Sequence, residues 1–196
     1  MINRNRVANG ATAAFVGAAA GAVALVSIGL FFTFGQPFGA INDLALLLMT
    51  AALAPMALAS YELGGRTPLR PAQASLALVT VAVTAWCAVQ LAMVVGLVTF
   101  DYGRGATGAF AAESFTQIVF GAWILGASLL AGPWLPSRPR WLGVLAGAGT
   151  VTSAMGLLMG GVDHPLTWVG GLGYEIAWPI WAFLLGRVFR RAGAGK

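Results

Sequence analysis

Six runs of roughly 20 mostly apolar residues divide this chain of 196 residues. A helix of about 20 such residues crosses the hydrocarbon core of a bilayer, so each run is long enough to span it. Lipid offers no hydrogen bonds to a backbone, which favours α-helices in such runs. We therefore predict an all-α bundle of six transmembrane helices in a single membrane domain, residues 1–196. The approximate helix limits are 12–34, 43–63, 76–99, 114–135, 141–162 and 167–188.

The low content of charged residues supports this class of protein. Only 9% of the residues are charged and 59% are hydrophobic, whereas soluble domains carry about 25% charged residues. The 27 glycines are typical of helices that pack closely in lipid. The first run is too long for the core of a cleavable signal peptide, so we expect it to remain as an anchor.

The distribution of positive charge predicts the orientation. Ten of the eleven Lys and Arg residues lie at the two termini or in the loops after the second and fourth runs, and Arg104 alone lies on the other side. Because Lys and Arg loops stay in the cytoplasm, we predict that both termini are cytoplasmic. The basic residues form short clusters between apolar runs, which indicates contact with the lipid bilayer and no binding of nucleic acid.

The residue types that usually hold metals or cofactors are scarce. The chain has one cysteine, Cys87, and one histidine, His164, far apart in the sequence. We expect no metal site and no cofactor from this pattern. Asp163 and His164 end the fifth run, where loop polarity is a commoner role than a catalytic dyad. The sequence contains no nucleotide-binding loop or hydrolase constellation.

The stretch LGYEIAWPIW, residues 172–181, places a glutamate inside an otherwise apolar run. Pro179 should free the backbone carbonyl of Glu175, four residues earlier, and Pro55 should likewise kink the second helix. An embedded ionisable group is costly and is therefore a candidate functional site. Two alternatives stay open: Glu175 ties two helices together by a hydrogen bond, or it lies at the outer, hydrated boundary.

Other polar residues are predicted at a similar depth in the outer half of the membrane. Gln90 lies near the level of Glu175, and Gln117 lies nearer the outer boundary. Trp178 shares a helix face with Glu175 and forms one wall of a possible cavity. The candidate ligand-binding residues are Glu175, Trp178, Gln90, Gln117, Trp86, Trp123 and Asn42.

Four of the six acidic residues are assigned to the outer boundary: Asp43, Asp101, Glu113 and Asp163. For Asn42 and Asp43, capping of the second helix is favoured over ligand binding. Glu62 lies at the inner boundary, four residues before Arg66, a spacing that suits a surface ion pair.

Glycines four residues apart predict close helix packing. Gly17 and Gly21 lie in the first run, and Gly143/Gly147 and Gly156/Gly160 lie in the fifth. Packing within the chain is the favoured interpretation of such pairs. A homo-oligomer or a partner subunit that contacts Gly17/Gly21 or Gly143/Gly147 is the alternative.

The turn GQPFGAIND, residues 35–43, and the general layout resemble small multi-pass bacterial membrane proteins of unknown function. The resemblance implies a location in the bacterial inner membrane. It implies no activity.

Three functions are compatible with these residues. The first is binding or transport of a small apolar or cationic ligand in an outward-opening pocket around Glu175. The second is a membrane-embedded enzyme, similar in its chemistry to membrane terpene cyclases, with Glu175 as general acid on an isoprenoid or lipid. Asp43 or Asp163 would supply its second acid. The third is a structural or assembly role, in which Glu175 and the glycines serve packing alone.

Overall fold

The computed structural model describes residues 2–64, 69–97 and 109–195. Its helices are α1 (Arg4–Phe34), α2 (Phe38–Ala51), α3 (Leu53–Leu63), α4 (Leu69–Val94), α5 (Ala109–Leu129), α6 (Ser137–Gly160), the short 3-10 helix η1 (Gly161–Asp163) and α7 (Pro165–Gly193). The prediction of an all-α fold is confirmed, since these ranges contain helices and no strand.

Four helical segments are long and apolar enough to cross a membrane. They are α1, the continuous path of α2 and α3, α4 from Ala72, and α6 extended through η1, with mean hydropathies of 2.2, 1.8, 2.0 and 1.6. The remaining long helices, α5 and α7, carry the acidic residues Glu113 and Glu175 in their N-terminal halves.

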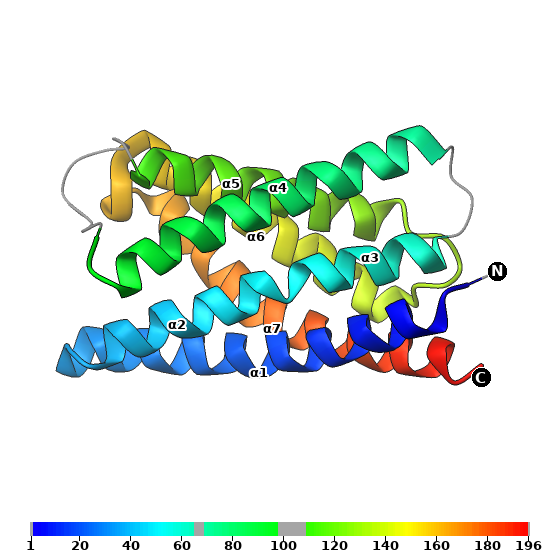
Figure 1. Ribbon diagram of the computed structural model, residues 1–196. Helices are drawn as coiled ribbons and strands as arrows, with labels where there is room; N and C mark the ends of the chain where they lie inside the picture. Colours follow the sequence, from blue (N-terminus) through cyan, green and yellow to red (C-terminus); the bar gives the residue numbers. More distant parts are fainter. Residues whose placement is uncertain (1, 65–68, 98–108, 196) are drawn as a thin grey trace.

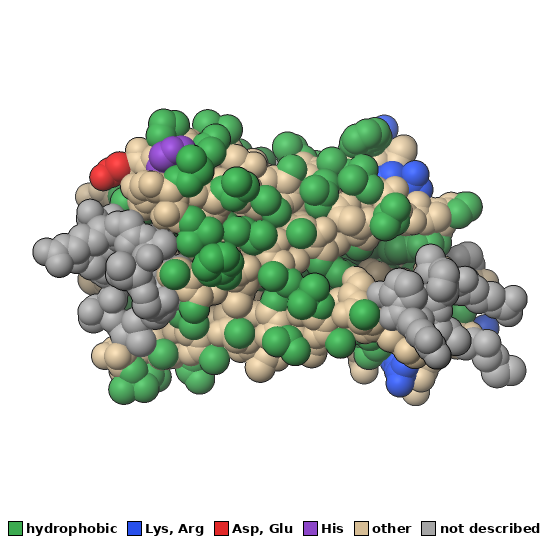
Figure 2. Space-filling model, turned by 90° about the horizontal axis from the view of Figure 1, so that it is seen from above, with side chains coloured by type: hydrophobic (Ala, Val, Ile, Leu, Met, Phe, Trp, Pro, Cys, Tyr) green, Lys and Arg blue, Asp and Glu red, His purple; other side chains and the backbone are tan. Residues whose placement is uncertain are grey.

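The helices form one elongated bundle (Figure 1). Helix α7 packs against both α1 and α6, and α5 packs on the other side of α6. The α2–α3 path runs along α1 and contacts α4, which also packs on α5. Both termini lie at the same end of the bundle (Figure 1). Figure 2 shows basic side chains at this end, and acidic and histidine side chains at the other. We call these the Arg-rich end and the acidic end.

Several helices begin earlier than the apolar runs predict. Helix α1 starts at Arg4 because the Asn3 side chain accepts a hydrogen bond from the Arg6 backbone N–H at 3.3 Å and caps it. Helix α2 starts at Phe38, so Asn42 and Asp43 lie within the helix. The prediction that they cap it is therefore wrong. Helix α5 starts at Ala109 and includes Glu113.

The two prolines act differently. The helix is interrupted at Ala52, between α2 and α3, three residues before Pro55. This confirms a distortion there, as expected for a proline that cannot donate to the preceding turn. Helix α7 runs through Pro179 without a break in its assignment.

The glycine pairs face neighbouring helices of the same chain. A Cβ atom on Gly17 would lie 2.8 Å from the Trp178 indole, and one on Gly21 would lie 3.0 Å from Pro179. A Cβ atom on Gly147 would lie 2.7 Å from the Gly121 carbonyl oxygen. These contacts agree with packing within the chain, the favoured interpretation of the two pairs.

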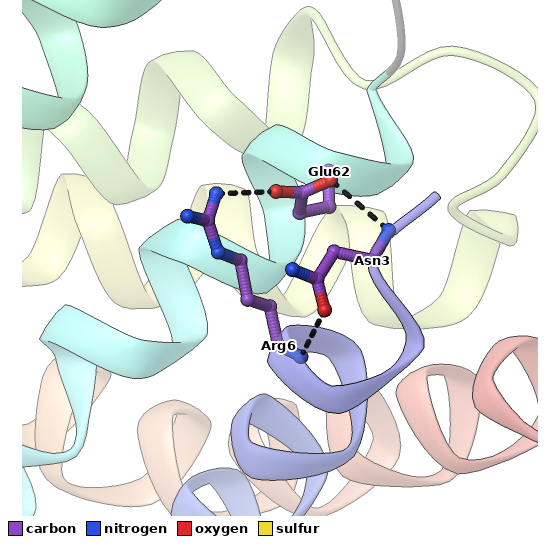
Figure 3. Close-up of polar contacts among 3 residues, drawn as sticks. All are labelled: Asn3, Arg6 and Glu62. Atoms are coloured by element: carbon purple, nitrogen blue, oxygen red, sulfur yellow. Dashed lines mark hydrogen bonds and ion pairs between the residues drawn. The ribbon is translucent and has the colours of Figure 1, made fainter. Parts of the chain in front are cut away.

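One ion pair joins the Arg-rich ends of α1 and α3 (Figure 3). Arg6 Nη1 donates to Glu62 Oε1 at 2.7 Å, and the Asn3 backbone N–H donates to Glu62 Oε2 at 3.3 Å. Glu62 thus pairs with Arg6 across two helices, and Arg66, its predicted partner, lies outside the described residues.

Replacing Glu62 by glutamine should cost less than about 1 kcal/mol, because the Arg6 side chain is 49% exposed and water screens the pair. Thermal unfolding in detergent at low and at high salt measures this, and Arg6→Gln with the double variant completes a mutant cycle. A loss that is large and independent of salt would contradict a screened surface pair.

Candidate functional site

A buried carboxyl group lies between α4 and α5 near the acidic end. Glu113, on the second turn of α5, is 7% exposed. Its Oε1 accepts a hydrogen bond from Gln90 Nε2 of α4 at 2.9 Å and another from Gln117 Nε2 at 3.3 Å. Gln117 follows Glu113 by four residues, so both side chains lie on one face of α5. These three residues form a hydrogen-bonded cluster of one carboxyl group and two amides.

Further buried polar atoms lie on α4, beside these residues, and on α2. The Trp86 ring is 2% exposed and meets Phe120 edge to face, with centroids 6.1 Å apart. Its indole N–H is close to the Glu113 carboxyl but has no well-formed hydrogen bond to a described residue. Asn42 Oδ1 and Gln90 Oε1 are also buried and lack hydrogen-bond partners among the described residues. Burial of a polar atom without a hydrogen-bond partner is unfavourable in free energy. These atoms are therefore suited to contact with a polar or charged ligand.

A second carboxyl group comes from α7. Glu175 Oε2 is buried and lacks a hydrogen-bond partner within the described ranges. The neighbouring Tyr174 hydroxyl donates to Met49 Sδ of α2 at 3.8 Å. Glu175 thus directly follows a residue that ties α7 to α2.

These carboxyls have no described basic partner. The basic side chains that the structure describes belong to the starts of α1 and α6 and to the last turns of α7, all at the Arg-rich end. Arg104 and Asp101 lie outside the described residues. Burying an ionised carboxylate far from a counter-charge is strongly unfavourable. Each carboxyl in this region is therefore suited to hold a proton or a positively charged group.

The structure brings together some of the predicted site residues and separates others. Gln90, Gln117 and Trp86 gather around Glu113. Trp178 packs into α1, against Gly17 and Gly21, and not into a wall beside Glu175. Trp123 lies nearer the Arg-rich end, in a groove described below.

The Asp163–His164 segment has a structural role where the described residues show it. Asp163 is exposed in η1. His164 caps α7, since its Nδ1 accepts a hydrogen bond from the Leu166 backbone N–H at 3.3 Å. Asp163 is therefore an unsuitable second acid for a buried reaction.

The sequence predicts Glu113 at the outer boundary, just before a fourth apolar run that begins at Ser114. In the structure α5 begins at Ala109, and Glu113 is buried on its second turn, with its carboxyl group bonded to Gln90 of α4. The signal was present in the spacing of Glu113 and Gln117, which places an acid and an amide on one helix face.

No family model, curated protein or solved structure matches the chain.

Proposed function

We propose that the chain is a six-pass protein of the bacterial inner membrane, with both termini in the cytoplasm, that binds and transports a small apolar cation. The α2–α3 path counts as one span, and α5 and α7 complete the six. The Arg-rich end is the cytoplasmic end, in accordance with the preference of Lys and Arg for that side. The acidic end then faces outward.

The observation that carries the proposal is the buried Glu113 carboxyl with its two amide donors and no described basic partner. Hydrogen bonds from Gln90 and Gln117 orient the carboxyl oxygen of Glu113, so that it is in position to bind a positively charged ligand. Glu175 supplies a second carboxyl from α7. The Trp86 indole, which is buried against Phe120 beside Glu113, is an aromatic group of the kind that binds organic cations.

Binding of tetraphenylphosphonium, an apolar monovalent cation, tests this proposal. Equilibrium dialysis of the purified protein in an uncharged detergent gives the affinity, corrected for protein-free micelles. A cation favours the ionised form of a nearby carboxyl, so its binding releases protons and should tighten as the pH rises. We expect Glu113→Gln and Glu175→Gln each to weaken binding by at least about tenfold, or 1.4 kcal/mol.

Two controls make the test specific. Glu62→Gln removes an acid at the Arg-rich end and should leave the affinity unchanged. Tetraphenylborate has the same shape and the opposite charge, and it should not compete. Equal affinities of the wild type and both Glu→Gln variants, or equal binding of the two ions, would rule out a carboxylate site for cations.

A second candidate function is acid catalysis on an isoprenoid or lipid, because Glu113 provides the second buried acid that such a reaction needs. The Glu175 acid would donate a proton to a carbon–carbon double bond. The Glu113 carboxylate would take a proton from the resulting carbocation, so that the protons balance. Product analysis after incubation with a linear polyene distinguishes this function: turnover that Glu175→Gln abolishes while substrate still binds favours catalysis over transport.

A further inference from the structure

A groove of about 450 Å³ lies toward the Arg-rich end, far along α5 from Glu113. Residues of α3, α4 and α5, together with those that follow α5, line it. Small side chains, including Ala57, Ala122 and Gly126, form much of its surface. Tyr61, Trp123 and Trp134 are its aromatic residues. The volume is within the usual range of small-ligand sites, about 300–1,000 Å³.

The groove is continuous with an apolar outer surface. Leu130, which lines it, is 86% exposed. Two further leucines of the lining helices are also exposed: Leu78 of α4 is 59% exposed, and Leu129 of α5 is 52% exposed. In a protein with membrane-spanning helices, surfaces of this kind face lipid chains. An apolar chain can therefore enter the groove sideways from the bilayer without crossing water.

One wall of the groove is fixed by an arginine. Arg140 Nη2 donates to the backbone carbonyls of Gly132, at 2.9 Å, and Leu135, at 3.1 Å. Gly132 lines the groove. The guanidinium thus stabilises the segment after α5 and adds positive charge beside it. Arg138 is exposed on the first turn of α6, and Arg4 and Arg6 lie at the same end of the bundle.

We propose that this groove binds an acyl chain of an anionic phospholipid from the leaflet at the Arg-rich end. The apolar, small-residue lining accommodates the chain, and the arginines of that end attract the headgroup, as basic residues do at the surface of an anionic leaflet. The inference rests on the membrane location of the chain and not on the cation site, from which the groove is separate.

Gly126 offers a direct way to block the groove. A Cβ atom at Gly126 would meet no atom within 4 Å among the described residues, so Gly126→Leu should fill the groove without disturbing the helix. Gly29 of α1 is also free of contacts within 4 Å and does not line the groove. Gly29→Leu is therefore the matched control.

The experiment measures quenching of tryptophan fluorescence by phosphatidylglycerol with brominated acyl chains, added to the purified protein in detergent. Trp123 and Trp134 line the groove and should report the bound chain. We expect saturable quenching in the wild type, in Gly29→Leu and in Glu113→Gln. In Gly126→Leu the saturable part should fall at least about fivefold. Brominated phosphatidylcholine should quench more weakly in the wild type.

The same measurements can overturn the proposal. Undiminished saturable quenching in a folded Gly126→Leu protein would exclude an acyl chain in the groove. Equal quenching by the two lipids would exclude selection of an anionic headgroup. A change of oligomeric state in Gly126→Leu, with quenching unaltered, would assign the groove to contact with a second protein chain. If Gly126→Leu does not fold, Ala122→Leu replaces it in the experiment. Ala122 lines the groove and is exposed.

Discussion

Gly170→Ala should destabilise the protein by about 3 kcal/mol, although alanine is the better helix former. Gly170 of α7 lies so close to α6 that a Cβ atom would be 2.6 Å from the Gly149 carbonyl oxygen and closer still to the Ser153 backbone nitrogen. Backbone atoms cannot rotate away as a side chain can, so α6 and α7 would have to separate. Overpacking of this kind typically costs about 1–3 kcal/mol and occasionally more. Unfolding in detergent, monitored by circular dichroism, measures the loss.

Gly171→Ala is the matched control for this variant. Its Cβ atom would lie 3.7 Å from Ser153 Oγ, which is ordinary van der Waals contact. The change should be neutral or stabilise the helix by up to about 1 kcal/mol. Similar losses in the two variants would show that α6 and α7 do not cross at Gly170.

The same crossing positions part of the candidate site. A Cβ atom on Gly149 would lie 2.7 Å from the Tyr174 backbone nitrogen, so the main chain just before Glu175 rests on α6. Separation of α6 and α7 in Gly170→Ala should therefore displace the Glu175 carboxyl as well. We expect weaker binding of tetraphenylphosphonium by this variant than by Gly171→Ala.

Trp178→Ala should cost about 3–5 kcal/mol, the usual range for truncation of a buried aromatic residue. The Trp178 side chain is fully buried, and its ring lies over the glycines of α1 and 6.0 Å from the Trp181 ring centroid. Truncation leaves a cavity between α1 and α7 that lipid cannot fill. Thermal unfolding in detergent gives the change in stability.

Trp168→Ala serves as the comparison, since Trp168 is 50% exposed and touches Phe32 at the surface. This truncation should cost less than about 1 kcal/mol. Trp178→Phe separates packing from ligand binding: it restores part of the stability and should leave the affinity for tetraphenylphosphonium unchanged. A selective loss of that affinity would instead place Trp178 at the ligand, as its spacing from Glu175 on α7 first indicated.

The sequence predicts the helical segments well, because the backbone of a long apolar run in lipid must make its hydrogen bonds within the protein, and an α-helix does so. It predicts their ends less well. The first turns of α2 and α5 lie outside the predicted apolar runs. Those turns make Asp43 and Glu113 residues within helices, and Glu113 is buried. The interruption near Pro55 was predictable because proline removes a hydrogen bond wherever it occurs in a helix.

Contacts between helices could not be predicted from one helix at a time. Spacing along α7 placed Trp178 beside Glu175, but the neighbouring helix determines what covers each side chain, and α1 covers Trp178. Glycine spacing likewise indicates close approach without naming the partner helix. The sequence predicts Gln90, Gln117 and Glu113 in or near the same half of the bundle, but it does not predict that Glu113 accepts hydrogen bonds from both amides.

The position of Glu113 near the acidic end has an electrical consequence. In the proposed orientation, a cation that reached this carboxyl from the acidic end would cross only a small part of the membrane voltage, because Glu113 lies on the second turn of α5. One elementary charge that crosses 100 mV changes its free energy by about 2.3 kcal/mol. If the proposed transport occurs, loading of the site should therefore depend weakly on voltage, and the later passage through the bundle should account for most of the voltage dependence.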